Sequence, residues 1–237
     1  MALVLVTGAS SGLGRNTARA LADAGHDVVV HVRAPARLRD PDGTARWKGV
    51  VTGDLADPEE MRGVARQAGE FGRFDAVIHN AGVLRPPEAV TVNTIAPYVL
   101  KALMEKPGTL VYLSSSMHRT GTTDLRGLTG GTASHDDSKL WVTALALAFA
   151  SRWEATASHA VDPGWVPTRM GGAGAPDDLA AGHRTQVWLA THHDVSPHTG
   201  GYRYHQQPQP PRPAAADEGF QVRLIAALER HTGVPLG

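Results

Sequence analysis

A glycine-rich turn between an apolar run and a helical pattern constrains the fold of this chain most. The run Leu3–Val6 is too short for a membrane span or a signal peptide core, so we interpret it as a buried strand. It leads into Gly8, Gly12 and Gly14, spaced G-x-x-x-G-x-G. Glycine permits a tight turn and lets backbone N–H groups approach phosphate, and a helix start adds positive potential. This context predicts a nucleotide diphosphate site; a purely structural turn is the alternative.

Apolar runs typical of buried strands alternate with helical patterns along most of the chain. The expected strands are Leu3–Val6, Val28–Val32, Val50–Val51, Ala76–His79, Leu110–Leu113, Ala157–Val161 and Gly201–Tyr204. The expected helices are Arg15–Ala24, one starting at Asp57-Pro58, Asn93–Met104, Ser138–Trp153, Asp178–Thr191 and Phe220–His231. Such alternation predicts an α/β fold, a Rossmann-type doubly wound parallel sheet of about seven strands with helices on both faces.

The length suits one domain over residues 1–237, and no internal repeat is visible. We expect a nucleotide-binding part over about 1–165, a substrate lid over about 166–200 and a C-terminal part over about 201–237. The four prolines of Pro208–Pro213 predict extended chain that packs on the surface as a tether.

Composition excludes several classes of function. The 23 Lys and Arg residues balance 23 Asp and Glu residues, so no net field favours nucleic acid or an anionic membrane. The 12 histidines do not show metal-ligand spacing, and we expect no metal site. Cysteine is absent, which removes disulfides and thiolate nucleophiles and fits a cytoplasmic protein.

Further short motifs follow the glycine turn in a fixed order. They are Thr7–Gly14, Asp54-Leu55, Asn80-Ala81-Gly82, Asn93, Ser114-Ser115, Lys139 and Pro163–Thr168. With these motifs the chain resembles the short-chain dehydrogenase/reductase family over nearly its whole length. Within the family, Ser115–Arg119 and Gly201–Tyr204 resemble the retinol-dehydrogenase-like group.

The resemblance implies a nicotinamide cofactor and assigns its contacts by position. The glycine turn would hold the pyrophosphate, and the later motifs would line the adenine, the ribose and the nicotinamide. The implied contacts are Gly8, Ser10, Ser11, Gly12, Leu13, Gly14, Asp54, Leu55, Asn80, Ala81, Gly82, Lys139, Pro163, Gly164, Val166 and Thr168. Taken alone, Asp54 would be a turn residue and Asn80 a strand cap.

The end of the second strand favours NADP(H) over NAD(H). An NAD site usually has an acidic residue there, whereas this chain has Arg33. A guanidinium matches a 2′-phosphate in charge and geometry, and Arg15 can assist. Arg37 and Arg39 make the region more basic. The alternative is a solvated basic loop.

The resemblance also implies a catalytic set with one unusual member. Ser115 would hold the substrate oxygen, Lys139 would bind the ribose, and Asn93 would position water behind the lysine. His135 stands four residues before Lys139, where the family has a tyrosine, and this spacing places both residues on one helix face.

Replacing phenol by imidazole changes the proton transfer. The ring is shorter, and its reference pKa is about 6.5 instead of about 10. The Lys139 cation would lower the pKa of His135 further. Neutral imidazole can accept a proton from an alcohol, whereas reduction needs imidazolium. We therefore expect an oxidoreductase that interconverts a small carbonyl and an alcohol with atypical proton transfer.

Two alternatives stay open. The chain can bind nucleotide without redox turnover, as a sensor, scaffold or partner subunit, or it can catalyse a non-redox reaction such as dehydration or isomerisation. His118 is either a second proton-transfer group or a polar loop residue, and Tyr112 is expected to point into the sheet packing.

Two regions bear on substrate and assembly. Trp165 and Met170 favour an apolar substrate face, although a packed helix would need the same residues. The segment Leu140–Ala150 is apolar nearly all round, so it must be covered on more than one side. The second cover is either a partner subunit, which gives a homodimer, or the C-terminal tail.

Overall fold

A single sheet of eight strands forms the centre of the computed structural model, which describes residues 1–38, 46–192 and 194–237. The strands are β1 (Leu3–Val6), β2 (Asp27–Val32), β3 (Gly49–Thr52), β4 (Ala76–His79), β5 (Thr109–Leu113), β6 (Ala157–Asp162), β7 (Tyr202–Tyr204) and β8 (Gln207–Gln209). Their order is β3-β2-β1-β4-β5-β6-β7-β8, and every pair is parallel except β7 with β8. This confirms the doubly wound fold.

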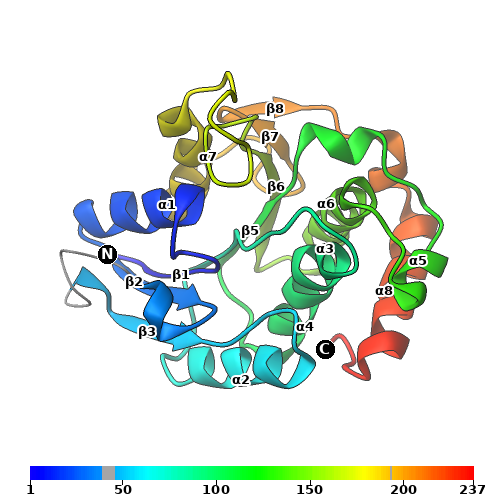
Figure 1. Cartoon of the computed structure of the whole chain (residues 1–237), viewed down its shortest axis with the longest axis horizontal. Coiled ribbons are helices and arrows are strands. Elements are labelled where there is room, and N and C mark those ends of the chain that lie inside the picture. The colour runs from blue at the N-terminus through cyan, green and yellow to red at the C-terminus, as the bar shows by residue number, and fades with distance from the viewer. Residues whose placement is uncertain (39–45, 193) are drawn as a thin grey trace.

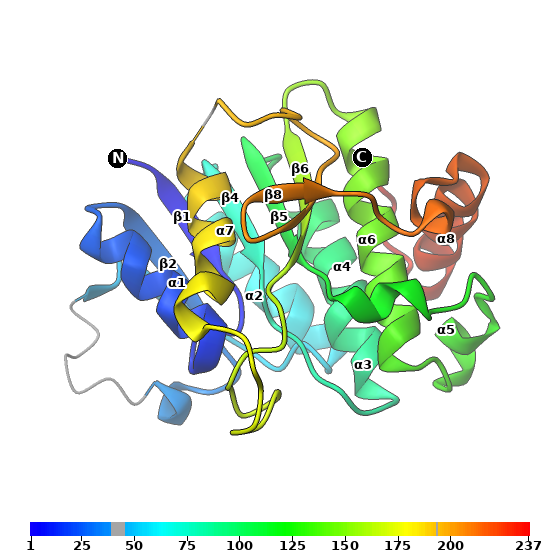
Figure 2. The same cartoon turned by 90° about the horizontal axis from the view of Figure 1, so that it is seen from above.

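Helices cover both faces of the sheet (Figures 1 and 2). The elements are α1 (Gly12–Asp23), η1 (Pro35–Arg37), α2 (Pro58–Gly69), α3 (Glu88–Val90), η3 (Thr91–Ile95), α4 (Ala96–Leu103), η4 (Ser116–Arg119), α5 (Arg126–Gly130), α6 (His135–Arg152), α7 (Leu179–Thr191), η5 (Pro213–Ala216) and α8 (Glu218–Thr232). Helices α1 and α7 pack together on one face, and α2, α4 and α6 cover the other. None of the described helices is long and apolar enough to span a membrane.

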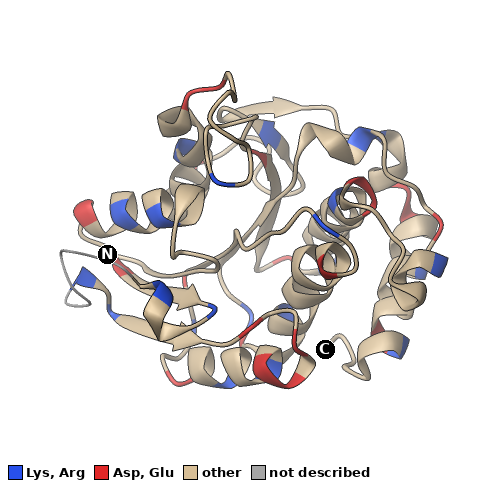
Figure 3. Cartoon of the chain, in the orientation of Figure 1, with Lys and Arg blue, Asp and Glu red and all other residues tan. Residues whose placement is uncertain are grey.

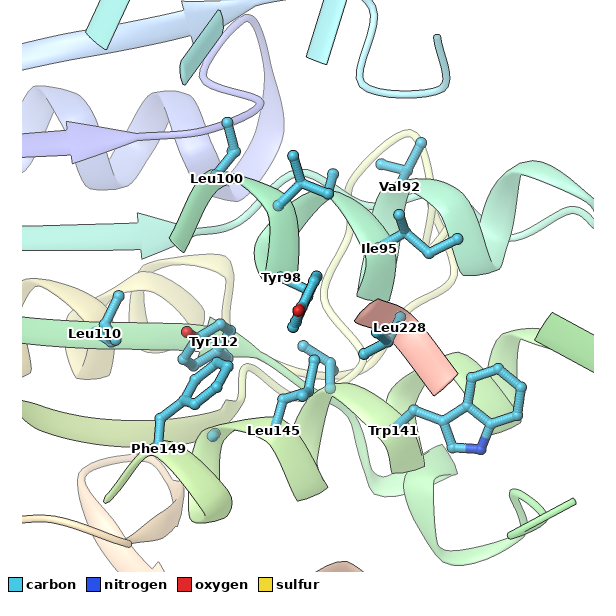
Figure 4. Close-up of a cluster of buried hydrophobic side chains, with 14 of the residues drawn as sticks. Val92, Ile95, Tyr98, Leu100, Leu110, Tyr112, Trp141, Leu145, Phe149 and Leu228 are labelled. Carbon is cyan, nitrogen blue, oxygen red and sulfur yellow. The ribbon is translucent and has the colours of Figure 1, made fainter. Parts of the chain in front are cut away.

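Alternate residues of each strand point to two separate hydrophobic cores. Leu5 and Val29 belong to the core under α2, α4 and α6, and Val4 and Val30 belong to the core under α1 and α7. Because both faces are covered, the central strands β1, β4 and β5 are apolar at most positions. Figure 4 shows the larger core, where Tyr112 of β5 lies beside Phe149 of α6, and where Tyr98 of α4 and Leu228 of α8 belong to the same cluster. Tyr112 is fully buried there, which confirms its predicted place in the sheet packing.

The predicted count of about seven strands is wrong by one. The eighth strand, β8, includes Pro208 and lies partly within the segment predicted as an extended tether. It pairs only with β7, at the edge of the sheet. Proline lacks the N–H that a second neighbour would require, so an edge strand can accommodate it.

Three helices begin three residues away from the predicted position. Helix α1 starts at Gly12 instead of Arg15. Helix α6 starts at His135 instead of Ser138, because Ser134 and Asp137 form a capping box in which each side chain accepts from the other's backbone N–H. Helix α4 starts at Ala96 instead of Asn93, because Asn93 belongs to the π-helical turn η3 that precedes it.

The outer side of α6 is covered by the C-terminal tail, since η5 and α8 both pack against it. The sequence left a partner subunit or the C-terminal tail as the element that covers this side of the helix, and the tail is the one observed. In the view of Figure 3, basic and acidic residues are interspersed over the ribbon. The chain contains 23 of each.

Candidate active site

The glycine turn is packed directly against the segment that follows β4. Thr7 Oγ1 accepts hydrogen bonds from the backbone N–H groups of Asn80 and Ala81, both at 3.0 Å, and Asn80 Nδ2 donates to Thr7 O at 2.9 Å. A Cβ on Gly14 would lie 2.3 Å from Asn80 Nδ2, and one on Gly8 would lie 2.8 Å from Ala81 Cα. Only glycine therefore fits this close approach.

The first turn of α1 differs from those of the other long helices. Asp57, Ser134, Asp178 and Asp217 cap α2, α6, α7 and α8 with side-chain oxygens. Among described helices of twelve residues or more, α1 alone has neither a side-chain cap from its N-cap residue, Ser11, nor an acid in its first turn. Its first N–H groups are thus available to an acceptor, and this fits a cofactor diphosphate.

A buried histidine that the sequence analysis did not single out supports the same turn. His31 Nδ1 accepts from the Gly8 N–H at 3.2 Å, and its Nε2 donates to Gly53 O at 2.9 Å. Burial lowers the pKa of His31, which favours this neutral form. The sequence signal for His31 was its place near the end of the second predicted strand, which neighbours the strand that leads into the glycine turn.

The adenine side of the predicted site contains a charge pair. Arg33 Nη1 lies 3.8 Å from Asp54 Oδ2, and the Arg33 side chain is 54% exposed. The side chain of Leu55, which is predicted to flank the adenine, is buried in the larger core. Arg39 lies outside the described residues.

His135 lies in the first turn of α6 with one ring nitrogen bound to the backbone. Its Nδ1 is 3.0 Å from Val83 O, and because a carbonyl can only accept, we assign the proton to Nδ1. Nε2 is then the basic nitrogen. Burial, and secondly the Lys139 cation, lower the pKa of His135, so the ring is neutral at neutral pH.

Asn93 joins His135 to the segment after β4. Its Oδ1 accepts from Val83 N–H and its Nδ2 donates to Val83 O, both at 2.9 Å. The same Nδ2 donates to Ser138 Oγ at 2.9 Å and lies 3.3 Å from His135 Nδ1. The π-helical turn places this amide between the two segments, a frequent use of such turns at functional sites.

Lys139 follows His135 by one helical turn and is buried. Its Nζ donates to Leu113 O at 2.7 Å, and a Cβ on Gly82 would lie 3.8 Å from it. Burial lowers the pKa of Lys139 to about 8, and Asp162 opposes the shift. The amine therefore lies where the ends of β4 and β5 meet.

Two adjacent serines have different environments. Ser114 is buried, and its Oγ lies 2.6 Å from Thr143 Oγ1 in the packing of α6. Ser115 is half-buried at the end of β5, and its Oγ accepts from Met117 N–H at 3.2 Å. Of the two hydroxyls, that of Ser115 is therefore the one available to a ligand.

The loop after β6 packs on the glycine turn. A Cβ on Gly12 would lie 3.4 Å from Thr168 Cγ2, and one on Gly182 would lie 2.8 Å from Val166 Cγ1 and 3.0 Å from Leu13 Cδ2. The structure thus brings the predicted segments 8–14, 80–82 and 163–168 together at the carboxyl edge of the sheet, with Asn93 and Lys139 beside them.

Two aromatic residues lie in buried hydrogen-bonded positions near the site. His118, for which the sequence left a proton-transfer group or a polar loop residue open, lies in η4, where it is fully buried and both ring nitrogens form hydrogen bonds. Tyr202 donates through its hydroxyl to Asp162 Oδ2 at 3.0 Å. Burial raises the pKa of Tyr202 well above its usual range.

Comparisons with known proteins agree with this arrangement. The family model described as short chain dehydrogenase matches residues 2–96. The short-chain dehydrogenase chyC of Penicillium rubens is 36% identical, with 100% of this chain and 99% of that protein covered. Mouse retinol dehydrogenase 14 is 27% identical, with 98% of this chain and 86% of that protein covered.

A solved structure supports the fold. A short-chain dehydrogenase from Burkholderia cenocepacia, in complex with NADP, superposes with a TM-score of 0.69 at 20% identity and covers 85% of this chain and 94% of that one. The chain belongs to the short-chain dehydrogenase/reductase family and is an oxidoreductase of that class.

Proposed function

We propose that the chain interconverts a small carbonyl compound and its alcohol with NADP(H). The hydrogen bond between His135 Nδ1 and Val83 O carries this proposal, because it makes Nε2 a proton acceptor beside Lys139. When bound, the nicotinamide supplies or accepts the hydride. The whole chain then acts as one dehydrogenase domain, with the loop after β6 and α7 forming its lid.

The proton would move through His135. In oxidation, neutral Nε2 accepts the proton of a substrate alcohol that Ser115 Oγ holds by a hydrogen bond. In reduction, the same nitrogen must first be protonated, which its lowered pKa disfavours at neutral pH. Lys139 would bind the ribose, and Asn93 fixes the Val83 carbonyl on which the imidazole depends.

Cofactor selectivity would depend on Arg33, which is exposed at the end of β2 with Asp54 as its charge partner. Arg33→Asp should weaken NADPH binding about tenfold or more and leave NADH binding within about twofold, because only NADPH carries the 2′-phosphate. Titration calorimetry measures both constants. Arg37→Asp, an exposed position of η1, makes the same charge change and is the matched control. Equal losses in both variants would assign the effect to general charge.

An apolar substrate fits the rim of the site. Leu84, Met117, Trp165 and Met170 follow β4, β5 and β6, and their exposed fractions are 44%, 44%, 60% and 45%. The Trp165 indole is held by a 2.8 Å hydrogen bond from Nε1 to Gly171 O. Trp165 and Met170 therefore lie on an exposed loop and not in a packed helix, which supports a hydrophobic substrate face.

A nucleotide-binding protein without redox turnover is the second candidate, since the His135 ring is largely buried against Val83 O. Mixing the protein with NADP(H) and a panel of aldehydes, ketones and alcohols, while following absorbance, separates the two. Cofactor that binds but never changes oxidation state would favour the second candidate. A homodimer through α6 and a cytoplasmic location stay predictions. Because α8 covers α6, the interface of such a dimer would also contain α8.

A further inference from the structure

His118 links the serine segment to the C-terminal part of the chain. Its Nδ1 lies 2.7 Å from Ser115 O, and its Nε2 lies 2.9 Å from the backbone N of Arg212. A carbonyl only accepts and a backbone N–H only donates, so the imidazole is neutral and carries its proton on Nδ1. The His118 side chain is 0% exposed, so water cannot form hydrogen bonds with its ring nitrogens. Loss of either bond would therefore leave a buried polar group unsatisfied.

Two further contacts join the same segments. Arg119 Nη2 donates to Pro210 O at 2.8 Å, and Arg212 Nη1 donates to Gly121 O. Residues 118–121, which follow Ser115, are therefore joined to residues 210–212 by three hydrogen bonds.

The same C-terminal part reaches the loop after β6. The ring of Tyr202 contacts that of His118, with 4.6 Å between centroids. The Tyr202 hydroxyl donates to Asp162 Oδ2 at 3.0 Å, and Asp162 Oδ1 accepts from the Gly164 N–H at 3.0 Å. One continuous set of contacts thus connects the serine turn with the start of the 163–168 loop.

We infer that residues 202–212 form a brace that positions Ser115. His118 is the positioning residue through which the brace acts, because it bonds to both Arg212 and Ser115. The inference deepens the proposed function and rests on it, because Ser115 is there the group that holds the substrate oxygen. The hydrogen bonds of His118 act on the backbone carbonyl of Ser115, whereas the link to the 163–168 loop runs through the ring contact with Tyr202. Removing the hydrogen bonds while an aromatic ring is kept at position 118 should therefore affect turnover and not cofactor binding. A displacement of about 1 Å at a reacting group can cost about 100-fold in rate.

Hydrogen exchange tests the brace without any need for turnover. His118→Phe keeps an aromatic ring against Tyr202 and removes both hydrogen bonds. Amide exchange over residues 114–121 and at Arg212, whose N–H donates to His118, should become at least about tenfold faster in this variant. His159→Phe is the matched control, because His159 is also 0% exposed and its Nε2 donates to a distant carbonyl, His198 O. Unchanged exchange in His118→Phe, or the same change in the control, would overturn the inference.

Kinetics test whether the brace acts through Ser115. His118→Phe should lower kcat/KM about tenfold or more while the dissociation constant for NADP(H) stays within about twofold. In a Ser115→Ala background the same change should cause no further loss, because the group being positioned is gone. A multiplicative loss in the double variant would refute a positioning role.

A milder variant covers the case in which His118→Phe does not fold. Arg119 is exposed, and Arg119→Ala removes only the bond to Pro210 O. Faster exchange over residues 114–121 and at the Arg212 amide is again expected, and its absence would count against the brace. Failure of the wild-type protein to turn over any substrate would contradict the proposed function, whereas the exchange experiments would still decide this inference.

Discussion

Burial and a backbone carbonyl together set the chemistry available to His135. The bond to Val83 O leaves Nε2 basic, and burial with the Lys139 cation lowers the pKa of the ring. The sequence placed the imidazole one turn from the lysine. It could not show which nitrogen would be basic, because that depends on Val83, which is 52 residues away in the chain.

The rate of alcohol oxidation should depend on pH through His135. Because the folded pKa lies below 6.5, the neutral form predominates at pH 7, and kcat/KM for oxidation should fall as pH drops through the lowered pKa. Reduction should show the opposite trend. The measurement is kcat/KM in both directions between pH 4.5 and 8, with His135→Ala as the control; if that variant shows wild-type rates, His135 carries no proton.

Introducing a phenol at position 135 is a second test of the role of this residue. His135→Tyr supplies a proton donor that stays protonated at neutral pH, so the reductase rate at pH 7 should rise, by about tenfold or more. Calorimetry should give an unchanged NADP(H) affinity. A lower rate than the wild type would mean that the site is arranged around imidazole.

At the scale of elements, the close packing of the glycine turn on the strand end has a testable consequence. A Cβ on Gly14 would lie 2.3 Å from Asn80 Nδ2 and 2.6 Å from Gly8 O, so Gly14→Ala must displace Asn80. We expect NADP(H) binding to weaken about tenfold or more and the free energy of unfolding to fall by about 1–3 kcal/mol.

Gly63 is the matched control for this substitution. It lies inside α2, where the nearest atom to a new Cβ is Arg66 Nη2 at 3.6 Å. Gly63→Ala should therefore stabilise the protein by about 0.5–1 kcal/mol without affecting cofactor binding. Denaturant unfolding and calorimetry measure both variants, and equal behaviour of the two would refute the packing argument.

At the scale of the whole molecule, several buried histidines make stability depend on pH. Burial lowers the pKa of His79 to about 3 and that of His159 to about 4. Below pH 6.5 the unfolded chain binds protons at these rings and the folded chain does not. The free energy of unfolding should therefore fall between pH 6.5 and 4, by about 2 kcal/mol per histidine at pH 5.

Urea unfolding at pH 8, 6.5 and 5 checks this expectation. Relative to pH 8, the two rings together should lower the free energy of unfolding by about 1 kcal/mol at pH 6.5 and by about 4 kcal/mol at pH 5. His159→Phe, if folded, should lose less stability on acidification than the wild-type protein. A stability that stays constant down to pH 5 would show that these rings are protonated in the folded chain.

The sequence by itself determined which segments form strands and helices and where the glycine turn lies, and its family resemblance supplied a candidate catalytic set. These features depend on local periodicity, on backbone freedom at single positions and on spacing within one helix. The predicted segments 8–14, 80–82 and 163–168 meet because the parallel strands that precede them, β1, β4 and β6, end at the same edge of one sheet, which the βαβ pattern already implies.

Only the tertiary structure decided how that set is held. Strand β8, the tautomer of His135, the contacts of His118 and the burial of Leu55 depend on residues that are distant in sequence and adjacent only after folding. Their signals cannot be found in a local pattern, because a hydrogen bond such as that between His118 and Arg212 spans 94 residues and is selected by packing.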